Sequence, residues 1–136
     1  MSVYPTSVLR TVALAAQGLH RAAPAGDPPG LDEVCRTVQD LGCLQIDTLQ
    51  MVQRSQYLAL WSRLGNYEPD DLDALASPRQ RRLFEGWQHA ACYIPIEEYR
   101  YQVPAQRDLR EHPSPGYARW LESKAGIETV PLVRQR

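Results

Sequence analysis

Apolar residues recur in the first forty positions at the spacing of one helix face. The stripe that begins after Pro5-Thr6-Ser7 predicts an amphipathic helix over residues 6–22, and residues 23–30 form a loop rich in Pro and Gly. A second stripe predicts a helix over residues 31–41, with Gly42 as its C-terminal cap. The stripes consist of Val8, Leu9, Val12, Ala13, Ala16 and Leu19, and of Leu31, Val34, Cys35, Val38 and Leu41.

The pattern loses its helical period after Gly42. Residues 43–47 are predicted to be extended, and Thr48 is placed to open the next helix. That helix continues to residue 64 on a looser pattern, with an interruption at residues 55–57. Residues 65–69 form a turn.

The middle of the chain changes from a helical to a β pattern. A short helix begins at Asp70, where its acidic first turn suits the positive end of the helix dipole, and it ends at Ser77-Pro78. Residues 83–95 are rich in strand-forming residues and predict paired strands, with Gly86 as the site of a bend or bulge.

Helical signals return weakly at the C-terminal end. Residues 96–101 start a helix, the pattern fades over the Pro-containing residues 104–118, and residues 117–124 form a last helix. Three helices followed by a short β element are typical of a winged helix-turn-helix, and the periodicities fit a plain helical bundle equally well. The fold is therefore predicted to be mainly α with a small β element. Residues 1–103 form a winged-helix domain, and residues 104–136 begin a truncated second domain.

Composition narrows the class of protein. A chain of 136 residues with 43% hydrophobic and 23% charged residues can build a core, and it has no apolar run long enough to span a membrane. Arg10 interrupts the only apolar N-terminal segment, so no signal peptide is expected. Cys35, Cys43 and Cys92 show no paired spacing and are interpreted as buried thiols of a reduced, cytoplasmic protein.

Charge is unevenly distributed, although the net charge is only −1. Residues 1–78 carry five Arg and nine Asp or Glu, giving −4, whereas residues 79–136 carry ten basic and seven acidic residues, giving +3. Almost all basic residues are arginines, which favour bidentate phosphate contacts, but a high Arg content also follows from genomic composition. Charge alone therefore does not identify a nucleic-acid-binding protein.

The most informative residues are Gln45 and Asp47, an amide and a carboxylate two positions apart in an apolar stretch. In an extended segment their side chains share one face, with Ile46 on the other. A carboxylate beside an amide can position and activate a water molecule. The alternative is that Asp47 caps the following helix while Gln45 satisfies a turn, which is the commoner use of such residues.

The densest basic run is residues 79–82, followed by Phe84, Trp87 and His89. Such interleaved cations and aromatic rings suit a phosphate backbone and stacked bases. The alternative is a solvated helix end that leads into a core strand, with both aromatic rings packed inward and His89 a satisfied core histidine. No histidine pair has metal-ligand spacing, and neither a phosphate-binding Gly-rich loop nor an activated cysteine is evident.

Three motifs in order resemble the YcaQ-like (AlkX/AlkZ) winged-helix DNA glycosylase family. Residues 41–48, Leu-Gly-Cys-Leu-Gln-Ile-Asp-Thr, are similar to the family's LGxxQIDS/T core. Residues 60–67 resemble its LFSRLGxY, and residues 82–91 its RxLFEYWxHEA. Arg54-Ser55-Gln56 stands in place of an RxH-like stretch, and residues 93–95 in place of an LLP ending. The resemblance covers about residues 8–103.

The resemblance implies tandem winged helices that cradle double-stranded DNA with alkylated or crosslinked bases, and a monofunctional glycosylase without cofactor or metal. Gln45 and Asp47 match the family's catalytic pair. Asp47 is then expected to orient and deprotonate the attacking water and to stabilise the oxocarbenium-like sugar, while Gln45 holds water or substrate. The residues proposed to contact DNA are Arg54, Arg63, Arg79, Arg81, Arg82 and His89. Such a protein is expected in the cytoplasm with the nucleoid.

The sequence departs from the family pattern at Gln56, where relatives often carry His, and at Gly86, which replaces a bulky aromatic residue. Full-length members are much longer. We therefore expect either the catalytic N-terminal part of a longer repair glycosylase or a short, non-catalytic winged-helix module that binds DNA or protein. A small helical scaffold without a nucleic-acid role is the third hypothesis.

Overall fold

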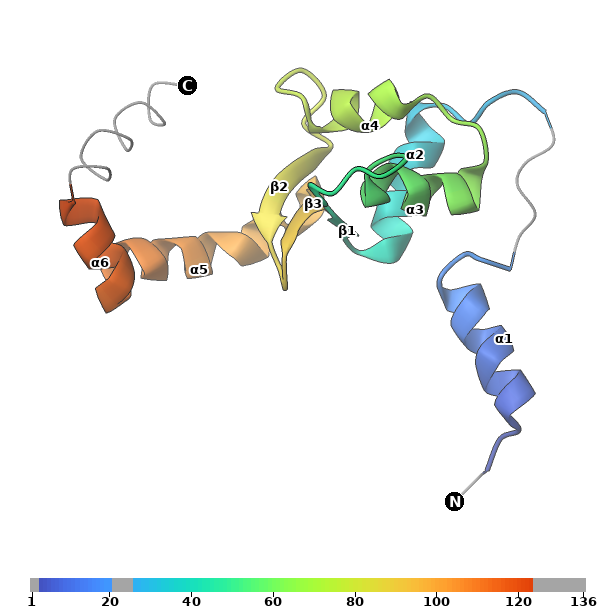
Figure 1. Ribbon diagram of the computed structural model, residues 1–136, viewed down its shortest axis with the longest axis horizontal. Helices are drawn as coiled ribbons and strands as arrows, with labels where there is room; N and C mark the ends of the chain where they lie inside the picture. Colours follow the sequence, from blue (N-terminus) through green and yellow to red (C-terminus); the bar gives the residue numbers. More distant parts are fainter. Residues whose placement is uncertain (1–2, 21–25, 124–136) are drawn as a thin grey trace. The chain divides into compact units, whose positions relative to one another are not determined.

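The computed structural model describes residues 3–20 and 26–123, and these belong to two compact units that meet between Tyr99 and Arg100 (Figure 1). The first unit contains four helices, a three-stranded sheet and a short 3-10 helix, and α5 runs from Tyr99 into the second unit. The elements are α1 (Thr6–Ala16), α2 (Leu31–Leu41), β1 (Leu44–Gln45), α3 (Ser55–Leu64), α4 (Pro69–Ala76), β2 (Leu83–Trp87), β3 (Ala91–Pro95), η1 (Ile96–Glu98), α5 (Tyr99–Glu111) and α6 (Pro115–Glu122). The prediction of a mainly α chain with a small β element is confirmed.

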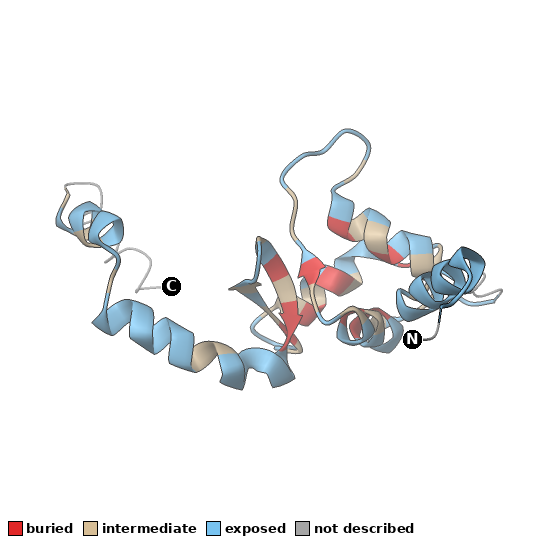
Figure 2. Ribbon diagram, turned by 90° about the horizontal axis from the view of Figure 1, so that it is seen from below, coloured by how far each residue is buried: buried red, intermediate tan, exposed pale blue. Residues whose placement is uncertain are grey.

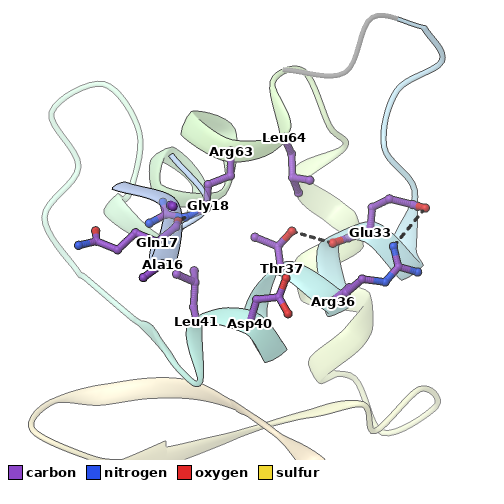
Figure 3. A pocket seen from close by; sticks show the side chains of 11 residues that line it. Ala16, Gln17, Gly18, Glu33, Arg36, Thr37, Asp40, Leu41, Arg63 and Leu64 are labelled. Carbon is purple, nitrogen blue, oxygen red and sulfur yellow. Dashed lines mark hydrogen bonds and ion pairs between the residues drawn. The ribbon is translucent and has the colours of Figure 1, made fainter. Parts of the chain in front are cut away.

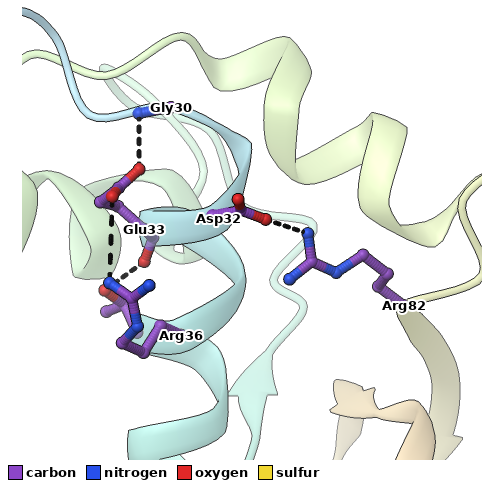
Figure 4. Close-up of polar contacts among 6 residues, drawn as sticks. Gly30, Asp32, Glu33, Arg36 and Arg82 are labelled. Atoms are coloured by element: carbon purple, nitrogen blue, oxygen red, sulfur yellow. Dashed lines mark hydrogen bonds and ion pairs between the residues drawn. The ribbon is translucent and has the colours of Figure 1, made fainter.

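Helix α2 spans the predicted residues and is stabilised at both ends. Glu33 in its first turn accepts the backbone N–H of Gly30 at 3.2 Å, and with Asp32 it places negative charge at the positive end of the helix (Figure 4). Gly42 ends the helix with φ +78°, a conformation that glycine adopts without steric cost.

Helix α1 ends earlier than the apolar stripe predicts. Gly18 has φ +70°, its N–H donates to the carbonyl of Ala15 at 3.0 Å, and the N–H of Leu19 donates to that of Leu14 at 2.9 Å. These two bonds form a Schellman motif, which stops the helix at Ala16. The extension to residue 20 was wrong because Gly18 acts as the terminator, and the end of the predicted helix, with part of the following loop, lies outside the described residues. No residue of α1 is buried.

Helix α3 begins at Ser55, where the sequence predicted an interruption. The helix predicted to open at Thr48 is absent, because residues 46–54 form an irregular segment that connects β1 to α3. The predicted extended piece is paired only at its centre, Leu44–Gln45. The short acidic helix is confirmed as α4, with Pro69 at its first turn.

The β region is a hairpin of β2 and β3 to which β1 adds a third antiparallel strand, in the order β1-β3-β2. Leu83 pairs with Pro95 and Trp87 with Ala91, so the register is continuous and the bulge predicted at Gly86 is absent. Gly86 is instead required because there is no space for a side chain at this position. A Cβ atom there would lie 2.7 Å from Ile94 Cδ1 and 3.0 Å from the ring of Phe84.

One apolar core lies between helices α2, α3 and α4 and one face of the sheet (Figure 2). Each helix contributes the residues of its apolar stripe, and β1 and β2 contribute one leucine each. The core residues are Val34, Cys35, Val38, Leu44, Leu60, Leu64, Tyr67, Leu72, Leu75 and Leu83. Burying such aliphatic side chains is the main force that stabilises this unit.

The C-terminal elements are more helical than the Pro content predicts. Helix α5 continues to Glu111 through Pro104, where the sequence pattern had faded. Helix α6 begins at Pro115, two residues before the prediction, because Ser114 caps it by accepting the backbone N–H of Tyr117 at 3.3 Å. Within residues 3–20 and 26–123, no helix is both long and apolar enough to cross a bilayer.

Substituting Gly86 with Ala is expected to destabilise the first unit by about 1–3 kcal/mol, because the added methyl group overlaps the fully buried Ile94 and the ring of Phe84. The measurement is urea unfolding followed by tryptophan fluorescence. Gly116→Ala is the control, since a Cβ atom there meets open space within α6 and is expected to leave stability unchanged or slightly raised. An unchanged unfolding midpoint in Gly86→Ala contradicts the prediction.

Candidate functional site

Gln45 and Asp47 lie at the free edge of the sheet. Gln45 is the last paired residue of β1, opposite Cys92, and its side chain is exposed. The backbone N–H of Ile46 continues the ladder by donating to the carbonyl of Ala91 at 2.8 Å. Asp47 therefore follows the point where the chain leaves the sheet, and it is half-buried.

Two hydrogen bonds fix the backbone and the carboxylate of Asp47. Its N–H donates to Gln56 Oε1 at 3.1 Å, and its Oδ1 accepts the N–H of Leu49 at 2.9 Å. The second bond is an Asx turn, which leads into an irregular segment and not into a helix. The interpretation of Asp47 as a helix cap was therefore wrong. Among the described residues no hydrogen-bond donor contacts Oδ2, so this oxygen can accept a proton or bind water.

Gln56 is a residue of the site that sequence reasoning treated only as a departure from the family pattern. It is the one buried polar side chain in the described part of the chain, with 1% of its surface exposed. A buried amide is costly unless its polar atoms are paired, and here its oxygen is paired with the backbone of Asp47. The signal in the sequence is a polar residue on the apolar stripe of α3, one turn before the buried Leu60.

The hairpin turn lies at the same end of the sheet as Asp47, because Ile46 hydrogen-bonds to Ala91, the first residue after the turn. Trp87 and His89 are exposed there, and Trp87 has 72% of its surface accessible. The alternatives that placed Trp87 in the core and made His89 a core histidine were wrong. Phe84 is partly buried and contacts Tyr99 edge to face at 5.2 Å between ring centroids, but it does not belong to the core cluster, to which β2 contributes Leu83.

Arg54 stands beside the site at the start of α3. Its side chain is exposed and forms no ion pair among the described residues. Burial, reinforced by Asp73 and Glu85, raises the pKa of Tyr93 on β3, and the positive charge of Arg54 opposes this shift. The guanidinium group therefore lies near β3, which carries the partner of Gln45, and the carboxylates of Asp73 and Glu85 act on the same strand.

The predicted basic run lies at the opposite end of the hairpin. Arg82 precedes β2, and a strand of five residues separates it from the turn by about 17 Å. Arg82 pairs with Asp32 of α2, a hydrogen bond that raises the pKa of the guanidinium group (Figure 4). Arg81 adopts φ +49° and donates to the carbonyl of Pro78 at 2.9 Å, while Arg79 is exposed. The structure therefore does not bring this run together with Asp47.

The side chain of Arg63, at the end of α3, is hydrogen-bonded to backbone carbonyls. Its Nε donates to the carbonyl of Gln17 at 2.8 Å, and its Nη1 donates to the carbonyl of Ala59 at 2.6 Å. These bonds satisfy backbone acceptors and leave few N–H groups of the guanidinium free to bind a phosphate. Of the six predicted DNA contacts, only Arg54 and His89 lie near Asp47.

A hollow among the described residues is separate from this site. It has a volume of about 470 Å³ and is lined by the C-terminal end of α1, by α2 and by the last turn of α3 (Figure 3). Arg36, Asp40 and Arg63 face it, whereas Gln45 and Asp47 do not line it. Gln45 is exposed at the edge of the sheet and Asp47 is half-buried, outside this hollow.

Neither metal nor thiol chemistry is indicated in the described part of the chain. No three His, Cys, Asp or Glu side chains gather there in a way that would hold a metal ion. Cys35, Cys43 and Cys92 are free, and burial raises the pKa of the Cys35 and Cys92 thiols, so these two stay protonated and weakly nucleophilic. The predicted buried thiols are confirmed for these two, while Cys43 is partly exposed.

Replacing Gln56 with Leu is expected to destabilise the first unit by about 1–3 kcal/mol, because the N–H of Asp47 loses its acceptor. Amide hydrogen exchange at Asp47 should accelerate by more than the loss of global stability explains. Gln50→Leu is the control, since Gln50 is exposed in the neighbouring segment and is expected to change neither quantity. Exchange at Asp47 that merely follows global unfolding contradicts the proposed anchor.

The sequence of this region matches a known protein family. The model of the AlkZ-like DNA glycosylases matches residues 38–135, which include Gln45, Asp47, Gln56 and the hairpin. No solved structure matches the chain. Because the match covers more than half of the sequence, the chain belongs to the AlkZ-like DNA glycosylase family.

Proposed function

We propose that the protein hydrolyses the N-glycosidic bond of alkylated or crosslinked bases in double-stranded DNA, with Asp47 and Gln45 as the catalytic pair. The observation that carries this proposal is the environment of Asp47. A buried amide fixes its backbone, one carboxylate oxygen is held by Leu49, and the other oxygen is unpaired among the described residues. This combination gives a carboxylate a defined position without neutralising it.

In the proposed reaction, the oxygen of a water molecule forms a bond to the anomeric carbon of the sugar. The bond between that carbon and the base nitrogen breaks, and the base leaves with the electron pair. Asp47 Oδ2 takes a proton from the water, and the negative charge of the carboxylate stabilises the cationic sugar before the proton moves. The exposed amide of Gln45 hydrogen-bonds to the water or the sugar. An N-alkylated purine carries a positive charge, so it leaves without a strong general acid.

We propose a winged helix-turn-helix for residues 31–95. Helices α2, α3 and α4 precede the hairpin, and the short strand β1, between α2 and α3, pairs with the hairpin strand β3. This order supports the assignment, and the turn with Trp87 and His89 is then the tip of the wing. The partition into a domain of residues 1–103 and a second domain of residues 104–136 is part of the same proposal, as is a place in the cytoplasm with the nucleoid.

A non-catalytic DNA-binding module is the second candidate. The exposure of Gln45 favours it, since glycosylases normally enclose the extruded base in a pocket and neither Gln45 nor Asp47 lines the hollow of Figure 3. Binding of duplex DNA without release of any base distinguishes this candidate from the enzyme.

Asp47→Asn is expected to lower the rate of base release by about 100-fold or more, since the general base is lost while the backbone bond to Gln56 is kept. The assay incubates duplex DNA containing N7-methylguanine with the protein and measures abasic sites by alkaline strand cleavage. Asp40→Asn, an exposed carboxylate of α2, is the control and should keep full activity. Equal rates for Asp47→Asn and the unmodified protein would exclude Asp47 as the base.

Arg54→Ala is expected to reduce the salt dependence of duplex binding by about one unit of the log–log slope, because one phosphate contact is lost. Fluorescence anisotropy over a salt titration measures this slope. Arg82→Ala serves as the comparison, since Arg82 is paired with Asp32 and its removal should leave the slope unchanged. A larger effect in Arg82→Ala than in Arg54→Ala would place the DNA at the other end of the hairpin.

A further inference from the structure

A run of apolar side chains points into solvent directly after Asp47. Leu49, Met51 and Val52 have 75%, 96% and 88% of their surfaces exposed, and Met51 is the most exposed of the large apolar side chains in the described part of the chain. They lie in residues 48–53, which we name the motif loop, between β1 and α3. Exposed apolar side chains gathered in this way usually mark a surface that meets a partner.

The motif loop is anchored at both ends. At its start the N–H of Leu49 is held by Asp47, whose own N–H is held by Gln56. At its end Arg54 is the N-cap residue of α3, and its carbonyl accepts the N–H of Tyr57 at 3.1 Å. The apolar tip is therefore presented from a fixed base that it shares with the proposed catalytic carboxylate.

Charge around the motif loop is mixed. Residues 48–67 contain no Asp or Glu, and Arg54, which is exposed and forms no ion pair among the described residues, adjoins the end of the loop. Asp47 adjoins its start, and the carboxylates of Asp73 and Glu85 act on Tyr93 together with Arg54. Charge therefore does not by itself select the partner, and the size of the apolar tip decides.

The size of the apolar tip argues against a protein partner. Stable protein interfaces bury about 800 Å² on each side, which three side chains do not supply. A wedge between two base pairs needs only one or two apolar side chains, because the space between partly unstacked bases is narrow. The base that is extruded for hydrolysis leaves a gap of this kind in the stack.

We propose that the motif loop inserts Leu49, Met51 or Val52 into the base stack of duplex DNA beside the base that Asp47 acts on. The partner is a duplex with a weakened base step, and insertion holds the extruded base outside the stack. This inference rests on the proposed function, because it places the DNA against the same carboxylate.

The experiment follows insertion by fluorescence. A duplex carries 2-aminopurine, a base whose fluorescence rises when it unstacks, next to an N7-methylguanine, and binding is measured at low salt with the Asp47→Asn protein so that no base is released. The test variant adds Leu49→Ser, Met51→Ser and Val52→Ser. Met51→Leu keeps an apolar tip, and Leu109→Ser removes an exposed apolar side chain of α5.

Binding of the Asp47→Asn protein is expected to raise the fluorescence, and the triple variant is expected to abolish the rise and weaken binding about tenfold. Met51→Leu and Leu109→Ser should behave like the unmodified loop. No rise with an unmodified loop, or a rise that the triple variant retains, overturns the proposal. Concentration-dependent self-association that the triple variant removes also overturns it, because the tip is then a protein contact.

The excision assay separates this proposal from the proposed function. If the protein that retains Asp47 inserts the motif loop but releases no base, insertion is supported and the glycosylase activity is refuted. Excision that is unaffected by the triple variant refutes the wedge and leaves the activity standing.

Discussion

The hydrogen bond between the side-chain oxygen of Gln56 and the backbone of Asp47 connects the core of the protein to its candidate chemistry. Gln56 is held among the apolar residues of α3, where an unpaired amide would be costly. The bond therefore contributes to folding and to the position of a carboxylate at the same time. It holds Asp47 at the start of the motif loop, where the carboxylate also forms the Asx turn with Leu49.

The sheet divides the polar residues between two ends. The end that carries Asp47 also carries the hairpin turn with Trp87 and His89, and it lies near Arg54. The other end carries the basic run, in which Arg82 is paired with an acidic residue of α2. A run of arginines in the sequence does not by itself predict a free cationic surface, because neighbouring carboxylates can pair with it. Arg54, a single arginine, lies nearer to Asp47 than this run does.

The helices that were predicted well from the sequence are those whose bounds are set by residues within or next to the helix. The bounds of α2 follow from its apolar stripe and from Gly42, and α4 follows from its proline and acidic first turn. The start of α3 was misplaced, because Leu49 and Val52 fit the helical spacing although both are exposed in the segment before the helix. Gly86 was misread, since the need for a glycine comes from Ile94 on the partner strand.

The candidate site was only partly predictable. Its central pair was chosen because residues 41–48 resemble the motif of the family to which the chain belongs, since spacing alone favoured a helix cap. Gln56 was missed because a polar residue on an apolar stripe was treated as an interruption of the helix, and the exposed motif loop because its apolar residues fitted the helical spacing. Both features depend on the tertiary fold, because the motif loop begins and Gln56 is bound where the chain leaves the sheet after Ile46.

Single-turnover excision by Gln56→Leu tests the central claim most directly. If the bond from Gln56 positions Asp47 for water activation, the excision rate falls at least tenfold while the affinity for the duplex, measured with the same DNA, stays the same. Circular dichroism and the unfolding midpoint confirm that the variant is folded at the assay temperature. A folded Gln56→Leu protein that releases the base at the unmodified rate would contradict the account.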